Sequence, residues 1–295
     1  YVVDATENGS NNCTNIAKLF GNGQRLMGND PDKMQESFGK IASDILTPAY
    51  KNVVINDTLS DYVQFAELNP TLQVYAHTLN DNGEEIGNPV RLVEEKDYTK
   101  TIDKNTKKIS VNILKGEELP DNVLYRVSFD VIPVTNACLS ANGYNATGEE
   151  GTDINDWYDS SPDKNNGFYS NVNNEAYVEY QENDNEKQTA LYQKPIIQID
   201  KVSKTVNKVW EDTLSSHPEV TVVLTAEVPG KNVQLNPLTQ VLNDQNGWTY
   251  TWNTLPKYYY DYDANGRAER TEIQYTITEQ DVEGYTAKYS LSGTT

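Results

Sequence analysis

The stretch that decides the fold reads Asn246-Gly-Trp-Thr-Tyr-Thr-Trp252. Its three aromatic residues alternate with threonines, so they share one face of a predicted strand. Two further motifs flank it, Lys208-Val-Trp210 before and Tyr275-Thr-Ile-Thr-Glu279 after. The later motif continues the same period of two. Together the three motifs predict a small β-domain.

Lys208 and Glu279 are the residues of this stretch that could carry chemistry. Glu279 ends an apolar strand, where a buried carboxyl group is costly unless it has a partner. Burial would favour a neutral Lys208 amine, which can attack an amide, and a protonated Glu279, which can polarise the amide carbonyl. The alternative is that both side chains are solvated, because lysine and glutamate are almost never fully buried.

Motifs across residues 203–295 occur in the order KVW, NGWTYTW, LPKY, YTITE and GY. This order resembles that of the collagen-adhesin B-type (Cna-B) domain of Gram-positive surface proteins. The resemblance implies that Lys208 forms an amide bond with an asparagine of the last strand, with Glu279 as the proton shuttle. It also implies that this asparagine lies just past a sequence such as Gly293-Thr-Thr295, where the chain stops. We therefore expect the domain to lack its last strand and to carry no bond at Lys208 in the chain as given.

Residues 48–202 are predicted to form a longer β-domain. Three motifs mark it: VVINDTL at 53–59, YRVSFDV at 125–131, and GFYS followed by NEAYVEY within 167–180. The second of these alternates cleanly between polar and apolar side chains. The set resembles the collagen-adhesin A-type domain, which implies an immunoglobulin-like fold.

The A-type resemblance implies a Lys–Asn bond catalysed by an aspartate, and its I-x-D-x-L motif assigns that acid to Asp57. We expect Asn174 to be the acceptor, because it would share a strand face with Ala176, and Asn173 is the fallback. Lys51 is the only nearby lysine, although one strand can seldom supply both partners of a buried pair. The alternatives are a lysine outside this chain, and ordinary turn chemistry at Asp57 and Asn174.

Residues 1–47 read differently from the rest. Asp30-Pro31 is a helix start, and apolar residues follow at helical spacing as far as Ile45. The segment resembles the last strand and helix of a von Willebrand factor A (vWA) domain, as found in pilus-tip adhesins, but it lacks the Asp-x-Ser-x-Ser metal signature.

Taken together, the three regions predict an all-β chain of two tandem immunoglobulin-like β-sandwiches, 48–202 and 203–295, after a short N-terminal helical segment.

Composition excludes several functions. The formal net charge is −20, which argues against binding nucleic acid. No apolar run approaches the roughly 20 residues of a membrane span, and no signal peptide or sorting signal is present, so we expect an internal fragment. With two histidines and no phosphate-binding loop, a turnover enzyme is not expected. Cys13 and Cys138 could form one disulfide or be two unrelated thiols.

A possible calcium loop is the one cofactor signal. Asp261, Asp263, Asn265 and Glu272 have the spacing of an EF-hand loop. Such a loop joins two helices, whereas predicted strands flank this one. The alternative is a β-hairpin with Asn265-Gly266 at its turn. We therefore expect no cofactor, and calcium at this loop is the one alternative.

The sequence thus predicts a structural and adhesive stalk segment of a Gram-positive cell-surface or pilus adhesin. Such a protein is extracellular and attached to the cell wall, with the anchor outside this segment. Its expected partners are host extracellular matrix proteins or glycans, or neighbouring pilin subunits, with no membrane insertion. The alternative is a binding module that uses the polar loop of residues 139–171 or the tyrosine-rich turn at 257–262. Catalysis is expected only within the chain, as autocatalytic cross-linking.

Overall fold

The structure is a computed structural model that describes residues 2–4, 25–27, 50–114, 117–120, 122–148, 166–182 and 186–290. It is almost entirely β-structure, which confirms the predicted fold class. Ahead of residue 50 it describes two short parallel strands, β1 (Val2–Asp4) and β2 (Arg25–Met27). The helix predicted from Asp30 to Ile45 lies outside the described residues. None of the described helices is long and apolar enough to cross a membrane.

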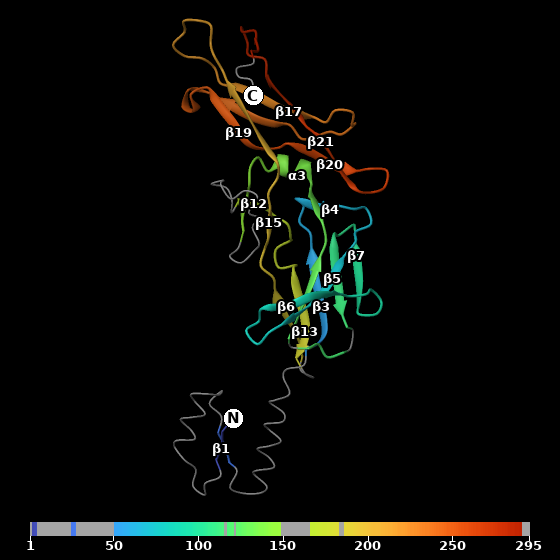
Figure 1. Cartoon of the computed structure of the whole chain (residues 1–295). Coiled ribbons are helices and arrows are strands. Elements are labelled where there is room, and N and C mark those ends of the chain that lie inside the picture. The colour runs from blue at the N-terminus through green and yellow to red at the C-terminus, as the bar shows by residue number, and fades with distance from the viewer. Residues whose placement is uncertain are drawn as a thin grey trace.

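The first domain, residues 50–199, packs two antiparallel sheets around one core (Figure 1). The larger sheet has the order β14-β13-β3-β8-β7: Lys187–Leu191, Tyr177–Glu182, Tyr50–Thr58, Lys108–Ile113 and Tyr98–Asp103. The smaller has the order β6-β5-β9: Glu85–Arg91, Gln73–Leu79 and Val123–Ser128. Apolar residues alternate along β8, so Ile109, Val111 and Ile113 all point into the core.

Two small sheets continue the first domain toward the second. One pairs β4 (Val63–Phe65) with β10 (Val131–Pro133). The other has the order β11-β12-β15: Ala146–Thr147, Asn166–Tyr169 and Ile196–Ile197. Between β10 and β11 lies the short helix α3 (Thr135–Ser140). Most of the polar loop predicted at 139–171 lies outside the described residues.

The second domain, residues 201–290, is a smaller sandwich. One sheet pairs β16 (Lys201–Asn207) with β19 (Thr249–Pro256), and the other has the order β18-β17-β22: Leu238–Leu242, Val220–Glu227 and Gln274–Glu279. The predicted aromatic face points inward, because Trp252 belongs to the core of this domain and Trp248 and Tyr250 pack against it. Trp252 is the most buried of the three, with 2% of its surface exposed.

A two-stranded hairpin of the second domain reaches back onto the first. It consists of β20 (Tyr258–Tyr262) and β21 (Ala268–Glu272). The amide of Ala268 donates to the carbonyl of Ala66 at 2.8 Å, and the Tyr262 hydroxyl donates to the carbonyl of Phe65 at 2.7 Å. An isolated bridge between Glu67 and Arg267 thus joins the hairpin to the first domain, and these bonds across the boundary restrict motion between the two domains.

Helix α3 closes the same boundary from the first domain (Figure 1). Its residue Leu139 is 2% exposed and belongs to the core of the second domain. Thr135 accepts a hydrogen bond from the amide of Tyr260 at 3.3 Å and donates to the carbonyl of Tyr258 at 3.2 Å. The two sandwiches therefore share part of one core rather than meeting at a loose linker.

Candidate functional site

Lys208 and Glu279 meet inside the second domain, as the resemblance to the Cna-B domain implied. Lys208 directly follows β16, and Glu279 is the last residue of β22, so the two side chains come from opposite sheets. The Lys208 Nζ atom lies 3.1 Å from Glu279 Oε1 and 3.0 Å from Oε2. The side chains are only 13% and 10% exposed. An amine and a carboxyl group thus share a largely dry site between the sheets.

Aromatic rings cover the amine. The Trp210 ring centroid lies 4.4 Å from Lys208 Nζ, a cation–π distance. Trp210 stacks on His217 at 4.3 Å and meets the edges of Trp248 and Tyr285 at 5.4 and 4.7 Å. The sequence motif around Lys208 therefore has a physical role: its tryptophan covers the lysine two residues away.

Asp212 holds this aromatic cover together. Its carboxylate accepts from the Tyr285 hydroxyl at 2.9 Å and lies 2.8 Å from His217 Nε2. The hydrogen bond with His217 is the largest of several causes that hold the pKa of Asp212 below its ordinary value. The loop after Lys208 is thereby tied to the segment that follows β22. This connection was not predicted from the sequence, because nothing in the spacing pairs Asp212 with Tyr285.

The Lys208–Glu279 pair can exist as an ammonium with a carboxylate or as an amine with a carboxylic acid. The second form is the one that can attack and polarise an amide. Among the described residues, no asparagine side chain hydrogen-bonds to either group.

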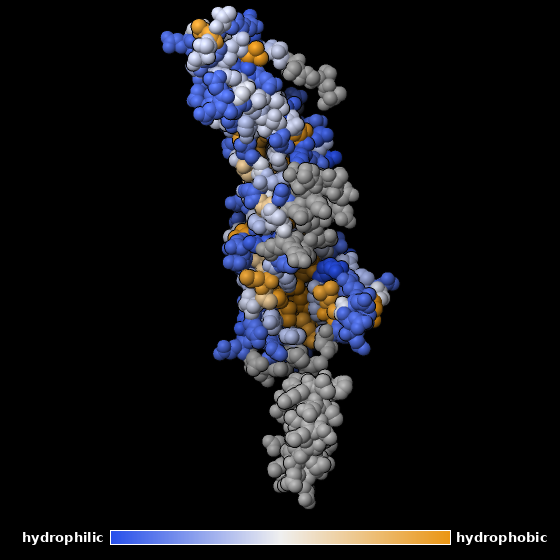
Figure 2. Space-filling model, turned by 90° about the vertical axis from the view of Figure 1, so that its left-hand side faces the viewer, coloured by the Kyte–Doolittle hydropathy of each residue, from blue (hydrophilic) through white to orange (hydrophobic). Residues whose placement is uncertain are grey.

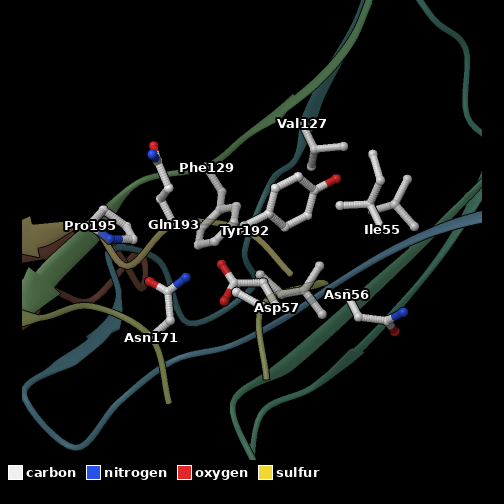
Figure 3. A pocket seen from close by; sticks show the side chains of 12 residues that line it. Ile55, Asn56, Asp57, Val127, Phe129, Asn171, Tyr192, Gln193 and Pro195 are labelled. Atoms are coloured by element: carbon white, nitrogen blue, oxygen red, sulfur yellow. The ribbon is translucent and has the colours of Figure 1, made fainter. Parts of the chain in front are cut away.

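Asp57 faces a cavity in the first domain (Figure 3). It lies on β3, opposite Ile109 of β8, and its Oδ1 atom is buried without a hydrogen-bond partner. Burial raises the pKa of Asp57 to about 6. The cavity has a volume of about 240 Å³, and its lining is mostly apolar, with Val127, Phe129 and Tyr192 among the residues around it. The Asp57 carboxyl group therefore has one buried oxygen without a partner, beside a mostly apolar space.

Asn171, rather than Asn174, lines this cavity, together with Asn56. The predicted acceptor Asn174 is exposed and has a left-handed backbone, with φ 63°, and Asn173 is exposed as well. The assumption that the strand already included Asn174 was wrong, because β13 begins at Tyr177. Asn171 is 7% exposed, lines the cavity with Asp57, and accepts a hydrogen bond from Ser170 Oγ at 2.6 Å. Figure 3 shows its amide and the Asp57 carboxylate beside the same space.

Lys51 does not reach the cavity. Its Nζ atom lies 3.6 Å from Glu118 Oε1, and it is not among the residues that line the cavity around Asp57. Asn52 has a left-handed φ of 51°, and the pairing of β3 with β13 shifts register nearby, so alternation along β3 does not carry through from Lys51 to Asp57. Lys51, the nearby candidate, is therefore not placed to pair with Asp57.

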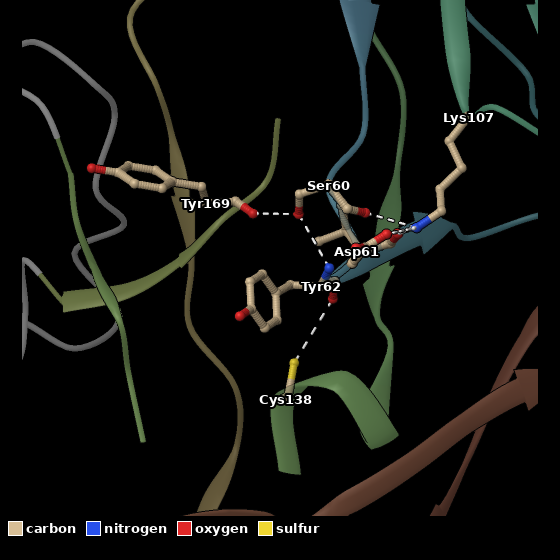
Figure 4. Close-up of polar contacts among 7 residues, drawn as sticks. Ser60, Asp61, Tyr62, Lys107, Cys138 and Tyr169 are labelled. Carbon is tan, nitrogen blue, oxygen red and sulfur yellow. Dashed lines mark hydrogen bonds and ion pairs between the residues drawn. The ribbon is translucent and has the colours of Figure 1, made fainter. Parts of the chain in front are cut away.

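A second polar cluster near α3 has a structural role (Figure 4). Lys107 donates to the carbonyls of Ser60 and Val63 at 2.7 and 3.1 Å, while Cys138 Sγ lies 3.8 Å from the carbonyl of Tyr62. Cys138 is a fully buried free thiol, and Cys13, the other half of the possible disulfide, lies outside the described residues. Burial raises the pKa of the Cys138 thiol to about 12.

The calcium motif is a hairpin turn. Asp263 accepts from the amides of Asn265 and Arg267 at 2.8 and 2.9 Å, so its carboxylate organises the turn. Asp261 pairs with the Lys231 ammonium at 2.9 Å, and Glu272 lies at the other end of the hairpin, opposite Tyr258. The four predicted ligands do not converge. Throughout the described part of the chain, no group of three or more His, Cys, Asp or Glu residues could hold a metal ion.

The fold and these sites define a class of protein: tandem β-sandwiches with acids buried in their interiors. The family model of the domain of unknown function DUF7604 matches residues 50–198, and that of the Cna protein B-type domain matches residues 204–295. Because the first match covers just over half of the chain, the chain belongs to the DUF7604 family. It also carries a Cna protein B-type domain, which agrees with the resemblance seen in the sequence.

Similar solved structures include the pilus adhesin SpaC of Lactobacillus rhamnosus GG. It is 14% identical with a TM-score of 0.38, and the match covers 87% of this chain and 26% of SpaC. The pilus 2b backbone protein of group B streptococcus is 12% identical with a TM-score of 0.30, and the match covers 75% of this chain and 76% of that protein. This chain spans about a quarter of SpaC, and no curated protein matches it.

Proposed function

We propose that this chain is a structural stalk segment of a Gram-positive cell-surface or pilus adhesin, built to form amide cross-links within its own domains. The single observation that carries the proposal is the Lys208–Glu279 pair, with Nζ to carboxylate distances of 3.0 and 3.1 Å between opposite sheets. The Cna protein B-type domain at 204–295 supports it. On this proposal the protein is extracellular and attached to the cell wall.

The proposed reaction joins Lys208 to an asparagine on an added last strand. The Lys208 nitrogen attacks the side-chain carbonyl carbon of that asparagine, a new C–N bond forms, and the original C–N bond breaks to release ammonia. Glu279, as a carboxylic acid, donates its proton to the departing nitrogen, and the carboxylate so formed takes the proton that the attacking amine loses. Fixing the amine and the acid about 3 Å apart removes the entropic cost of bringing these two groups together. That cost is a large part of the barrier to so slow a reaction.

A cross-link at this place would change how the domain bears force. Lys208 lies at the end of the first strand of the second domain, so a bond to the last strand would connect the two ends of the sandwich. Tension would then pass through covalent bonds rather than through the hydrogen bonds between strands. The close junction with the first domain, through Leu139 and the β20–β21 hairpin, would pass the load on without a flexible hinge.

Asp57 and Asn171 are the proposed second cross-linking site. Asp57 would be the acid, since its carboxyl group is buried with an unmet oxygen, and Asn171 would be the acceptor. The hydroxyl of Ser170, 2.6 Å from the Asn171 Oδ1 atom, would stabilise negative charge on that oxygen during attack.

On this proposal, the partners of the chain are those of a stalk segment: neighbouring pilin subunits, or host matrix proteins and glycans.

Intact-mass measurement tests the proposal. The chain is extended past Thr295 by a strand of alternating valine and threonine that carries one asparagine, placed at either of two successive positions so that both strand faces are sampled. We expect a mass about 17 Da lower than calculated, the mass of the ammonia released. Glu279→Gln, which keeps the shape of the side chain, should abolish the loss.

Matched controls separate this site from other residues. Lys204 and Glu227 are exposed residues of strands in the same domain, so Lys204→Ala and Glu227→Gln should leave the mass loss intact. Retention of the calculated mass in both folded extended chains would overturn the proposal for Lys208. A mass loss that survives Glu279→Gln at an unchanged rate would overturn the role of Glu279.

A further inference from the structure

The smaller sheet of the first domain carries two arginines on either side of a tyrosine. In the strand order β6-β5-β9, Tyr75 of β5 lies opposite Arg91 of β6 and opposite Arg126 of β9. Residues directly opposite each other in neighbouring strands share one face of the sheet. These three residues, which we call the arginine row, therefore run straight across the sheet.

The arginine row lies on the outer face of this sheet. Val74, the residue before Tyr75, belongs to the core of the first domain, and its partner Val127 packs against that core. Because side chains alternate along a strand, the arginine row points the other way. Arg91 and Arg126 are exposed and Tyr75 is half-buried, so the row is accessible to a ligand.

The two arginines differ in what holds them. Nη2 of Arg126 lies 2.6 Å from Oε1 of Glu85, and the other oxygen of Glu85 lies 2.7 Å from Nδ1 of His77. A guanidinium group has five N–H donors, so Arg126 keeps donors for a ligand after it has paired with Glu85. Within the described part of the chain, no carboxylate pairs with Arg91.

The charge of the arginine row contrasts with that of the whole chain. The formal net charge of the chain is −20, and two of its five arginines lie in this row. The positive charges of Arg91 and Arg126 exceed the single negative charge of Glu85. Figure 2 shows that hydrophilic side chains cover much of one face of the molecule, so charge and not hydropathy distinguishes a site for a polar ligand.

The chemistry of the row fits an acidic sugar chain. Guanidinium groups bind carboxylates through paired N–H donors, and an aromatic ring between them offers a flat apolar surface to a sugar ring. The Cα atoms of the two arginines are about 10 Å apart, because each strand spacing is about 4.8 Å. That distance is close to the length of one disaccharide. Gln73 and Ser128, the next exposed pair on the same face, add polar groups for sugar hydroxyls.

We propose that the arginine row binds an acidic polysaccharide of the host matrix that carries one carboxylate in each disaccharide. Successive carboxylates pair with Arg91 and Arg126, and the sugar between them lies on Tyr75. The inference rests on the proposed function only in taking a matrix glycan as the class of partner. The choice of a sugar over an acidic peptide rests on the ring of Tyr75 between the two charges.

Titration calorimetry of the full chain with an octasaccharide of hyaluronan tests the inference, because this sugar carries a carboxylate on every second ring. Two matched ligands are an uncharged octasaccharide of N-acetylglucosamine and a glutamate peptide of equal charge. We expect hyaluronan to bind at least about tenfold more tightly than either. Raising the salt from about 0.05 to 0.2 M should weaken its binding, because salt screens exposed charges.

Variants separate the row from other arginines. Arg91→Gln and Arg126→Gln should each weaken hyaluronan binding about tenfold, and Tyr75→Leu, which removes the flat ring, about fivefold. The matched control is Arg270→Gln, which should leave binding unchanged. Arg270 is an exposed arginine of the second domain that pairs with Asp200 at 3.4 Å, much as Arg126 pairs with Glu85.

Three results would overturn the inference. One is the absence of hyaluronan binding by the folded chain. Another is equally tight binding of the glutamate peptide, which would make the row a general anion site. The third is an equal loss of affinity in Arg91→Gln and Arg270→Gln, which would place the binding elsewhere. None of these results bears on the mass loss at Lys208, which belongs to the other domain.

Discussion

Replacing Lys208 by methionine removes one partner of a buried ion pair while keeping most of the volume of the side chain. The carboxyl group of Glu279 would then remain between the sheets without its amine, with the Trp210 ring above an uncharged chain. Breaking a buried pair in this way costs about 3–5 kcal/mol, because the remaining charge is desolvated and unpaired. About a tenth of each side chain is exposed, so we expect the lower end of that range, about 3 kcal/mol.

Urea unfolding followed by tryptophan fluorescence measures this cost. Trp210, Trp248 and Trp252 belong to the core of the second domain or pack against it, so the signal reports mainly on that domain. With a slope of about 2 kcal/mol per molar urea, a loss of about 3 kcal/mol lowers the midpoint by about 1.5 M. The double variant Lys208→Met with Glu279→Leu should recover most of the loss, since replacing both partners removes the buried charge.

The control is Lys204→Met, on the exposed face of the same strand, β16. It should change the free energy of unfolding by no more than about 0.5 kcal/mol. If Lys208→Met costs no more than this control, then Lys208 is effectively solvated, and the reasoning that places a dry amine beside Glu279 is refuted.

Three further predictions follow from the first domain and its junction with the second. Asp57 has a pKa near 6 in the folded protein against 3.8 unfolded, so the folded state binds more protons between these values and stability falls as pH rises from about 4 to 6. The difference in the free energy of unfolding between wild type and Asp57→Asn should change by about 2 kcal/mol across that window, and a constant difference would contradict the raised pKa. Leu139→Ala should cost about 3 kcal/mol and lower the unfolding midpoint of the second domain although Leu139 belongs to the first, whereas the exposed control Leu191→Ala should be nearly neutral. In a Cys13→Ser background, Cys138 should resist iodoacetamide at pH 8 until urea unfolds the protein, and rapid labelling of the folded chain would show that the thiol is not buried.

The resemblance to the Cna-B domain implied the pairing of Lys208 with Glu279, whereas the strand pattern alone left open that both side chains are solvated. Period-two alternation identifies which face a residue shares, and opposite sheets bring inward faces together. The cover formed by Asp212, His217 and Tyr285 was not predictable in the same way. It joins a loop to a segment after the last described strand, and neither has a periodic pattern.

The error at Asn174 has a definite physical cause. Alternation was extended backward from Ala176 into residues 173–175, where the chain turns and Asn174 takes a left-handed backbone. Parity is lost once a residue leaves the extended conformation. The true cavity residue, Asn171, follows the apolar Phe168 and Tyr169 of β12 and forms an isolated bridge with Leu59. That long-range pairing sets its position, and sequence spacing alone does not reveal it.

The calcium motif failed for a similar reason. The spacing of Asp261, Asp263 and Glu272 brings oxygens together only when the chain coils, whereas in an antiparallel hairpin the same spacing spreads them along two strands.

The junction between the two domains could not be predicted from the sequence either. Its hydrogen bonds, such as that from the Tyr262 hydroxyl to the carbonyl of Phe65, link residues far apart in the chain.

Peptide mapping of the chain extended past Thr295 tests the central claim most directly. Tandem mass spectrometry of a tryptic digest identifies whether the side chain of Lys208 is joined to the added asparagine. The account predicts a branched peptide that contains Lys208, is about 17 Da lighter than the sum of its two parts, and is absent when Glu279 is replaced by glutamine. Recovery of an unmodified Lys208 from the folded, extended chain, with Glu279 intact, would contradict it.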